Sequence, residues 1–399
     1  MNILFLSHCV PFPPDKGEKI RAYHEIQSLA REHRVHLACF GRSPSEIEQL
    51  GSLKNCCESV YGEPIPRTRA LVSAAIASTL GDSFVTSFYY SRTMERYVCG
   101  ILGSMDLVVV YSVAMARYVP AGTPTFADLV DVDSEKWKRY SRYLTPAVFY
   151  RIEARRIQEK ECGLARNALN TVFATQSERE LFLKFCPNAP SGVIENGVDC
   201  DHFDPKKQES IANVPPNVVF VGAMDYFPNA YAASWFARTV LPAFRERYAG
   251  FEFRIVGRDP HRMVRALANQ PGVKVTGTVP DVRPYLAASE LAVVPLPIAQ
   301  GIQNKVLEAL AMGKPVLLSP ATARTFSGHL PTGVTVCSTP EQYLAEYERQ
   351  RVRQGGFVPE IRQYALERFS WARSSAELLR AVSVAVAAFR PTPASMGSE

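Results

Sequence analysis

Short apolar runs alternate with helical patterns along most of this chain. Each run has three to six residues and ends at a glycine, a proline or a polar residue. A buried strand that feeds a helix and then a neighbouring strand builds a parallel sheet, so this rhythm predicts a doubly wound α/β fold. The first set of expected strands covers 3–6, 35–40, 107–111, 125–130 and 171–174, with helices expected over 19–31 and 147–169.

A second set of apolar runs follows the turn-rich segment ENGVDCDHFDPKKQES at 195–210, with strands expected over 218–221, 253–256, 291–294 and 316–318. Because 399 residues exceed one ordinary core, we expect two Rossmann-like domains, 1–205 and 206–368. A helical pattern over 361–389 predicts a crossover helix, 369–390, that returns to the N-terminal domain before a disordered tail, 391–399. Such sheets bind ligands outside the carboxyl ends of their strands, so we expect the site in the cleft between the domains.

Composition argues against several classes of function. The content of hydrophobic residues is 47% and that of charged residues is 21%, values typical of a globular enzyme. The net charge of +6 is spread along the chain, which does not favour nucleic-acid binding. The N-terminus MNILFLSHCV has no basic region or cleavage site of a signal peptide, and no apolar run reaches the roughly 18 residues of a membrane span. We therefore expect a cytoplasmic protein, with most of its nine cysteines reduced.

Common cofactor and nucleophile motifs are missing. No expected strand leads into G-x-G-x-x-G, which is not typical of NAD or FAD chemistry, and there is no Walker G-x-x-x-x-G-K-[ST] or G-x-S-x-G elbow. The histidines have no metal-ligand spacing. Asp131-Val132-Asp133 has the Asp-x-Asp spacing of a metal-binding motif, but it falls in the N-terminal domain, where we expect no metal ion. We expect neither a cofactor nor a metal ion.

The stretch AQGIQNKVLEALAMGKPVLLSP at 299–320 is a glycine loop that runs into a helix and then a buried strand. Backbone N–H groups and the positive dipole at a helix start suit a phosphate, and Lys305 would add a point charge. A capped core helix without a ligand explains the pattern equally well.

Further polar residues follow the expected strands, at the edge of each sheet where such folds bind ligands. In the first sheet they are Ser7, His8, Gly17, Glu18, Lys19, Tyr111, Ser112, Asp131, Asp133 and Ser134. In the second they are Gly222, Arg258, the loop 277–281 and residues 301–308.

Four motifs, in this order, carry a resemblance to a known family: ENGVD at 195–199, FVGAMDYFPNA at 220–230, GTVPD at 277–281 and GIQNKVLEALAMGKPVL at 301–317. Together they resemble the family 4 glycosyltransferases of the two-domain GT-B fold. SHCVPFPPDKGEKIRAYH at 7–24 and DLVDVDSEKW at 128–137 resemble the sugar transferases of PEP-CTERM and exosortase exopolysaccharide loci.

The resemblance implies a metal-independent hexosyltransferase that moves a sugar, with retention of configuration, from a nucleotide-diphosphate sugar to a saccharide. Glu308 matches the family's second signature glutamate, which binds the ribose. Gly17 matches the family's glycine loop, and His8, Asp131 and Lys305 are this sequence's own candidates where family residues are missing. The expected catalytic residues are therefore His8, Gly17, Asp131, Lys305 and Glu308. The expected donor-binding residues are Gly222, Arg258, Thr278, Val279, Gln300, Gly301, Ile302, Gln303, Asn304, Lys305 and Glu308, and the expected acceptor-binding residues are Glu18, Lys19, Ser112 and Asp133.

This sequence departs from the family at three places. Gln300 replaces the first signature glutamate, Ala223 and Met224 follow Gly222 where an arginine is usual, and Tyr111-Ser112 replaces a histidine. The alternatives are therefore a nucleotide-sugar epimerase of the same fold and a catalytically silent nucleotide-sugar-binding subunit. The aromatic and basic stretch 137–156 is either a solvated helix face or a peripheral contact with the inner face of a membrane, where a lipid-linked acceptor would lie.

Overall fold

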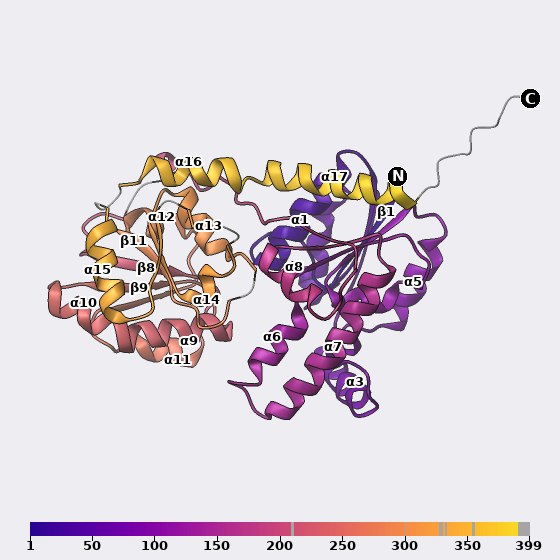
Figure 1. Cartoon of the computed structure of the whole chain (residues 1–399), viewed down its shortest axis with the longest axis horizontal. Coiled ribbons are helices and arrows are strands. Elements are labelled where there is room, and N and C mark those ends of the chain that lie inside the picture. Colours follow the sequence, from indigo (N-terminus) through magenta and orange to yellow (C-terminus); the bar gives the residue numbers. More distant parts are fainter. Residues whose placement is uncertain (209–210, 300, 327–329, 332, 353–355, 390–399) are drawn as a thin grey trace, which may run out of the picture. The chain divides into compact units, whose positions relative to one another are not determined.

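The computed structural model describes residues 1–208, 211–299, 301–326, 330–331, 333–352 and 356–389 (Figure 1). The chain forms two compact units. The N-terminal unit holds Met1–Ala174, Glu178–Ile194 and the described residues from Ser374 on, and the C-terminal unit holds Thr175–Ser177 and Glu195–Arg373. The expected tail, 391–399, lies outside the described residues.

The N-terminal unit is built on a seven-stranded parallel sheet of order β3-β2-β1-β4-β5-β6-β7. Its strands are β1 (Asn2–Ser7), β2 (Arg34–Gly41), β3 (Ser59–Pro64), β4 (Leu107–Tyr111), β5 (Thr125–Val130), β6 (Asn170–Phe173) and β7 (Ser191–Val193). The strand order reverses between β1 and β4, and ligands of doubly wound sheets bind outside the carboxyl ends at this point.

Helices and short 3₁₀ turns connect these strands and cover both faces of the sheet. They are α1 (Gly17–Ala30), α2 (Pro44–Glu48), η1 (Gln49–Leu53), α3 (Arg67–Thr79), α4 (Phe84–Phe88), α5 (Arg92–Leu102), η2 (Val113–Tyr118), α6 (Asp133–Tyr140), α7 (Ala147–Asn167) and α8 (Gln176–Leu183). Helix α17 (Trp371–Phe389) also covers this sheet, since Leu378 and Val382 are buried in one core with Ile3 and Phe5 of β1.

The C-terminal unit is built on a six-stranded parallel sheet of order β10-β9-β8-β11-β12-β13. Its strands are β8 (Asn217–Val221), β9 (Glu252–Val256), β10 (Val273–Gly277), β11 (Leu291–Val294), β12 (Val316–Leu318) and β13 (Val334–Val336). Its helical segments are η3 (Pro205–Lys207), α9 (Phe227–Trp235), the π-helical turn η4 (Phe236–Val240), α10 (Leu241–Arg247), α11 (Arg262–Leu267), α12 (Arg283–Ala288), α13 (Asn304–Ala311), α14 (Pro320–Ala323), α15 (Pro340–Gln350) and α16 (Pro359–Arg368). Here the order reverses between β8 and β11.

The α/β class and the two doubly wound sheets are confirmed, and the C-terminal helix packs on the N-terminal sheet as expected. Four strands go beyond the apolar runs of the sequence: β3, β7, β10 and β13. No helix among the described residues is long and apolar enough to cross a bilayer.

Candidate active site

The predicted loop and helix of the C-terminal unit lie at the point where its strand order reverses. Strand β8 ends at Val221 and continues into Gly222, and the chain after β11 leads to α13, which begins at Asn304. Because β8 and β11 are hydrogen-bonded neighbours, both segments leave the same edge of the sheet side by side. This edge is where a doubly wound sheet binds its ligand.

Lys305 of α13 lies against the glycine that follows β8. Its Nζ donates a hydrogen bond of 2.6 Å to Asn229 Oδ1 and lies 5.0 Å from the centre of the Phe220 ring. A Cβ on Gly222 would come within 3.1 Å of Lys305 Nζ and 2.9 Å of Asn229 Nδ2. A glycine at this position therefore provides the space that the ammonium group occupies. The amide of Asn229 is itself fixed, because Nδ2 donates to the Ala223 carbonyl at 2.9 Å.

The ammonium group of Lys305 has donor capacity left over. It makes one hydrogen bond among the described residues, whereas the ammonium of Lys314, at the other end of the helix, donates to the carbonyls of Ala287, Ser289 and Gly356. An ammonium group has three N–H donors. Lys314 is therefore a structural lysine, and Lys305 can bind an anion.

Burial perturbs both titratable groups on the first turns of α13. It lowers the pKa of Lys305 to about 7, against the opposing effect of Glu308. It raises the pKa of Glu308 to about 7, against the effect of Lys305. An incoming phosphate would favour the charged ammonium, and hydroxyl donors would favour the charged carboxylate.

The other predicted donor residues lie around this centre or farther along the sheet edge. Gly301 has a φ of 59°, Ile302 is buried, Gln303 is the N-cap of α13, and Asn304 Oδ1 accepts from Asn196 Nδ2 at 3.3 Å. The backbone carbonyl of Arg258, just beyond β9, accepts from Met224 N at 2.9 Å. Thr278 and Val279 follow β10 at the outer edge, where Thr278 is exposed and Val279 packs on the core. Gln300 lies outside the described residues.

In the N-terminal unit the structure groups His8 with Glu18. His8 Nε2 lies 3.8 Å from Glu18 Oε2, and Arg42 Nη2 donates to Glu18 Oε1 at 2.9 Å. Burial alone would raise the pKa of Glu18, but His8 and then Arg42 lower it to about 2. The His8 ring stacks on the Tyr111 ring, with 5.8 Å between the ring centres, and makes an edge-to-face contact with the Tyr89 ring, with 5.6 Å between the centres. These two contacts hold the imidazole in one orientation.

The loop after β5 is held by buried carboxyl groups from two helices. Glu161 of α7 accepts from the Ser134 N–H and hydroxyl at 3.1 and 2.6 Å, and Glu178 of α8 accepts from Val132 N at 2.7 Å. Burial raises the pKa of Asp131 to about 6, and its Oδ1 is buried with no hydrogen-bond partner among the described residues. Asp133, by contrast, pairs with Lys136 at 3.3 Å. Asp131 is thus a carboxyl group placed to hold or take a proton.

Two other predicted residues, Lys19 and Ser112, are bonded within the fold, and a third, Gly17, begins a helix. Lys19 is buried and its Nζ donates to Glu46 at 3.0 Å. Ser112 has a φ of 76° and caps η2 through Ala114 N. Gly17 is the first residue of α1. None of these contacts joins them to His8 and Glu18.

Sequence reasoning missed several residues that build these sites. Asn229, Asn196, Arg42, Tyr89, Glu161 and Glu178 each contact or support a predicted residue. Only Asn229 had a local signal, since an amide two residues into a helix that follows a glycine-ended strand is placed to face that glycine. The others come from distant segments.

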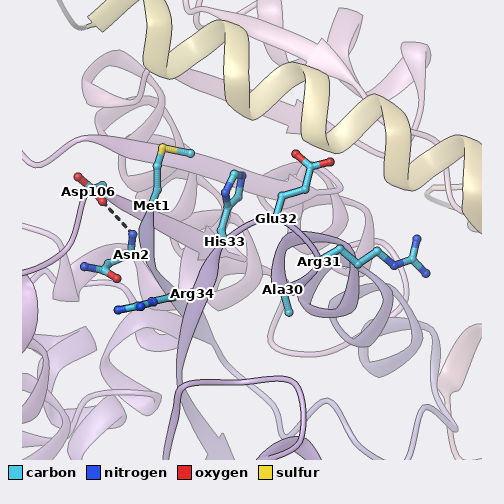
Figure 2. Close-up of a pocket in the computed structure, with 8 residues that line it drawn as sticks. All are labelled: Met1, Asn2, Ala30, Arg31, Glu32, His33, Arg34 and Asp106. Atoms are coloured by element: carbon cyan, nitrogen blue, oxygen red, sulfur yellow. Dashed lines mark hydrogen bonds between the residues drawn. The ribbon is translucent and has the colours of Figure 1, made fainter.

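A depression lies at the opposite edge of the N-terminal sheet. Figure 2 shows the residues that line it: Met1, Asn2, Ala30, Arg31, Glu32, His33, Arg34 and Asp106. Its volume is about 510 Å³. Asn2 begins β1 and Arg34 begins β2, so this is the amino edge, and Asp106 accepts from Asn2 N at 2.8 Å. It holds none of the predicted residues. No group of three or more His, Cys, Asp or Glu side chains within the described ranges has the arrangement of a metal site.

The two doubly wound parallel sheets, with a C-terminal helix on the first, define the GT-B fold. Residues 215–354 match the family described as Glycosyl transferases group 1. No similar sequence is found among the curated proteins.

Solved structures share this fold over nearly the whole chain. The sucrose-phosphate synthase of Thermosynechococcus elongatus is 14% identical with a TM-score of 0.68, and the alignment covers 97% of this chain and 100% of that one. HepE of Anabaena in complex with UDP is 14% identical with a TM-score of 0.63, covering 96% and 100%. WaaG, a glycosyltransferase involved in lipopolysaccharide biosynthesis, is 16% identical with a TM-score of 0.59, covering 94% and 98%. At these identities the likeness concerns the fold.

Proposed function

We propose that this protein is a retaining, family 4 glycosyltransferase. It transfers a sugar from a nucleotide-diphosphate sugar to a lipid-linked saccharide, in the assembly of an exopolysaccharide at the inner face of the cytoplasmic membrane. The observation that carries the proposal is the Lys305, Gly222 and Asn229 cluster, with Glu308 on the same helix, at the reversal point of the C-terminal sheet. This cluster falls inside the segment that matches the glycosyltransferase family, and HepE was solved with UDP.

The donor site follows from the chemistry of these groups. The Lys305 ammonium pairs with the diphosphate, and Gly222 lets the phosphates approach the backbone. Glu308 accepts hydrogen bonds from the ribose hydroxyls, which a carboxylate can do at both oxygens. As the sugar leaves, negative charge grows on the diphosphate, and a fixed ammonium in a partly buried site stabilises that charge without a metal ion.

The transfer itself forms one bond and breaks one. The acceptor oxygen bonds to the anomeric carbon on the face from which the diphosphate departs, and the electrons of the broken C–O bond leave with the nucleoside diphosphate. The acceptor proton passes to the departing phosphate oxygen. On the acceptor side, His8 and Glu18 offer a fixed ring and a carboxylate, and Asp131 offers a half-buried carboxyl group.

A thermal-shift panel of nucleoside diphosphates and nucleotide sugars tests the donor site. A ligand at about 100 times its Kd should stabilise the protein by about 2.7 kcal/mol. We expect one base to give this shift in the wild type and none to give it in Glu308→Ala. The control is Glu341→Ala, at the exposed start of α15, which should keep the shift.

The same protein then separates the alternatives. Turnover of the stabilising nucleotide sugar without any acceptor would identify an epimerase. Binding without turnover, even with lipid-linked saccharides present, would identify a silent subunit. If no nucleotide shifts the unfolding temperature, the donor site is wrong. Retention is read from the anomeric configuration of the product.

Donor affinity should be greatest near pH 7. Above that pH the free Lys305, with a pKa of about 7, is neutral and must take up a proton to pair with the diphosphate, so affinity falls by up to tenfold per unit. Below pH 7 Glu308, whose pKa is also about 7, must lose a proton before it can accept hydrogen bonds from the ribose hydroxyls, so donor affinity falls again. Calorimetric Kd values from about pH 5.5 to 9 check this. Glu308→Gln should abolish the acid limb, and a flat profile in the wild type would contradict the assignment.

A further inference from the structure

Helix α3 buries small residues and exposes large apolar ones, the reverse of what a helix that covers a core does. Its two buried residues are Ala70 and Ala74, one turn apart, so only methyl groups face the protein. Its large apolar side chains face outward: Leu71 is 42% exposed, Val72 59% and Ile76 56%, and Leu80 just beyond the helix is 82% exposed. Helices of globular proteins normally bury their large apolar residues.

The start of α7 repeats this feature. Tyr143, Val148 and Ile152 are also exposed, which places seven of the twelve large exposed hydrophobic side chains among the described residues on 71–80 and on 143–152. Single exposed hydrophobic residues are ordinary, but a concentration of this size marks a surface that meets an apolar partner. We refer to Leu71, Val72, Ile76, Leu80, Val148 and Ile152 as the α3–α7 surface.

The two helices form one fixed platform. Arg156 of α7 donates to Ser78 of α3 at 2.8 Å, and Figure 1 shows α3 beside α7 within the N-terminal unit. The turn after α3 is anchored by the buried carboxylate of Glu153, which accepts from the Ser83 hydroxyl and from Phe84 N and Val85 N at 2.7 to 3.0 Å. The helices that carry the exposed apolar side chains are therefore held together by hydrogen bonds.

Basic residues flank these side chains along the sequence. The segment 136–160 has eight Lys and Arg residues and two Glu, and Glu153 is buried in the anchor just described. Four of the eight basic side chains form ion pairs with acids: Lys136 with Asp133, Lys138 with Glu135, Arg155 with Glu159 and Lys160 with Asp82. Arg151 and Arg155 are exposed on the first turns of α7, and α3 begins with Arg67 and Arg69. Apolar side chains bordered by arginines are complementary to one partner, a bilayer with anionic headgroups over an acyl interior.

We propose that the α3–α7 surface docks this protein on an anionic phospholipid bilayer, with Val72, Ile76 and Leu80 entering the headgroup boundary and the arginines pairing with lipid phosphates. This gives a place to the membrane contact of the proposed function. The identity of a lipid-linked acceptor rests on that function, but the docking does not need sugar transfer.

Vesicle co-sedimentation of the full chain tests the proposal, with vesicles of phosphatidylcholine alone and of phosphatidylcholine with about 30% phosphatidylglycerol. We expect binding to the anionic vesicles and at least tenfold weaker binding to the neutral ones. The triple variant Val72→Gln, Ile76→Gln, Leu80→Gln should bind at least tenfold more weakly. Arg151→Gln and Arg155→Gln should each lower the partition coefficient about fivefold.

Val384→Gln is the matched control, because Val384 is 65% exposed on α17, away from the α3–α7 surface. It should bind vesicles like the wild type. Equal binding by the triple variant, or no binding to anionic vesicles, overturns the proposal. Light scattering that shows a wild-type dimer and a monomeric triple variant, without vesicle binding, would assign the surface to a second copy of the chain instead. The nucleotide shift should be unchanged in every variant, so a failed donor site and a failed docking surface give different results.

Discussion

Lys305→Ala should lower the rate of sugar transfer about 100- to 1,000-fold, the loss expected when one preorganised donor to developing charge is removed. The substitution should not lower stability. The pKa of Lys305 is depressed, so between about pH 7 and 10 the unfolded chain binds a proton that the folded chain does not, and the lysine costs folding free energy there. We therefore expect unchanged or raised thermal stability together with lost activity, measured by melting and by turnover of the donor.

The control for this prediction is Lys274→Ala. Lys274 is a 64% exposed lysine on the outer strand β10, where it lies 3.9 Å from Glu252, and its removal should leave turnover unchanged. If Lys305→Ala keeps its turnover to within about threefold, the diphosphate does not lie at Lys305. A folded but inactive Lys305→Ala that still binds the nucleoside alone would support the charge-pairing role over a merely structural one.

The strands that the sequence pattern missed have one physical property in common. β3 and β7 are the two edges of the first sheet, and β10 and β13 are the two edges of the second. An interior strand is covered on both faces and therefore reads as a continuous apolar run, such as Leu107–Tyr111. An edge strand is half exposed, and β3, SVYGEP, includes a glycine and a proline. The rhythm of apolar runs therefore predicted the two sheets but not their width.

In the candidate site too, residues within one stretch of sequence could be predicted, whereas contacts between distant segments could not. Lys305 and Glu308 could be predicted because loop, helix and strand follow one another in a single stretch of sequence. Asn229 is 76 positions from Lys305, and Glu161 is 27 from Ser134, so these contacts exist only once the sheets are assembled. Lys19 shows the same limit. A lysine near a predicted site was expected to bind an acceptor, yet it is buried against Glu46, a residue that no pattern connects with it.

Gly257→Ala should destabilise the protein by about 3 to 5 kcal/mol, because two costs add. Gly257 has a φ of 151°, a conformation that side chains of L-residues disfavour, and its Cβ would lie 1.7 Å from the carbonyl oxygen of Gly222. Met224 N donates to the Arg258 carbonyl, and Gly222 N to the Val256 carbonyl, so the segments after β8 and β9 are bonded together here. The new methyl group must separate the segments that follow β8 and β9, and this displaces Gly222, the residue against which Lys305 lies.

Gly250→Ala separates these two costs. Gly250 has a φ of 75° with open space around its Cβ position, so the substitution should cost only the strain, about 1 kcal/mol. Urea denaturation followed by tryptophan fluorescence measures both variants. Gly257→Ala should in addition lose the nucleotide-induced thermal shift, since displacing Gly222 moves the wall of the donor site, whereas Gly250→Ala should keep it. If the two variants lose equal stability and both bind nucleotide, the close approach of Gly257 to Gly222 does not shape the site.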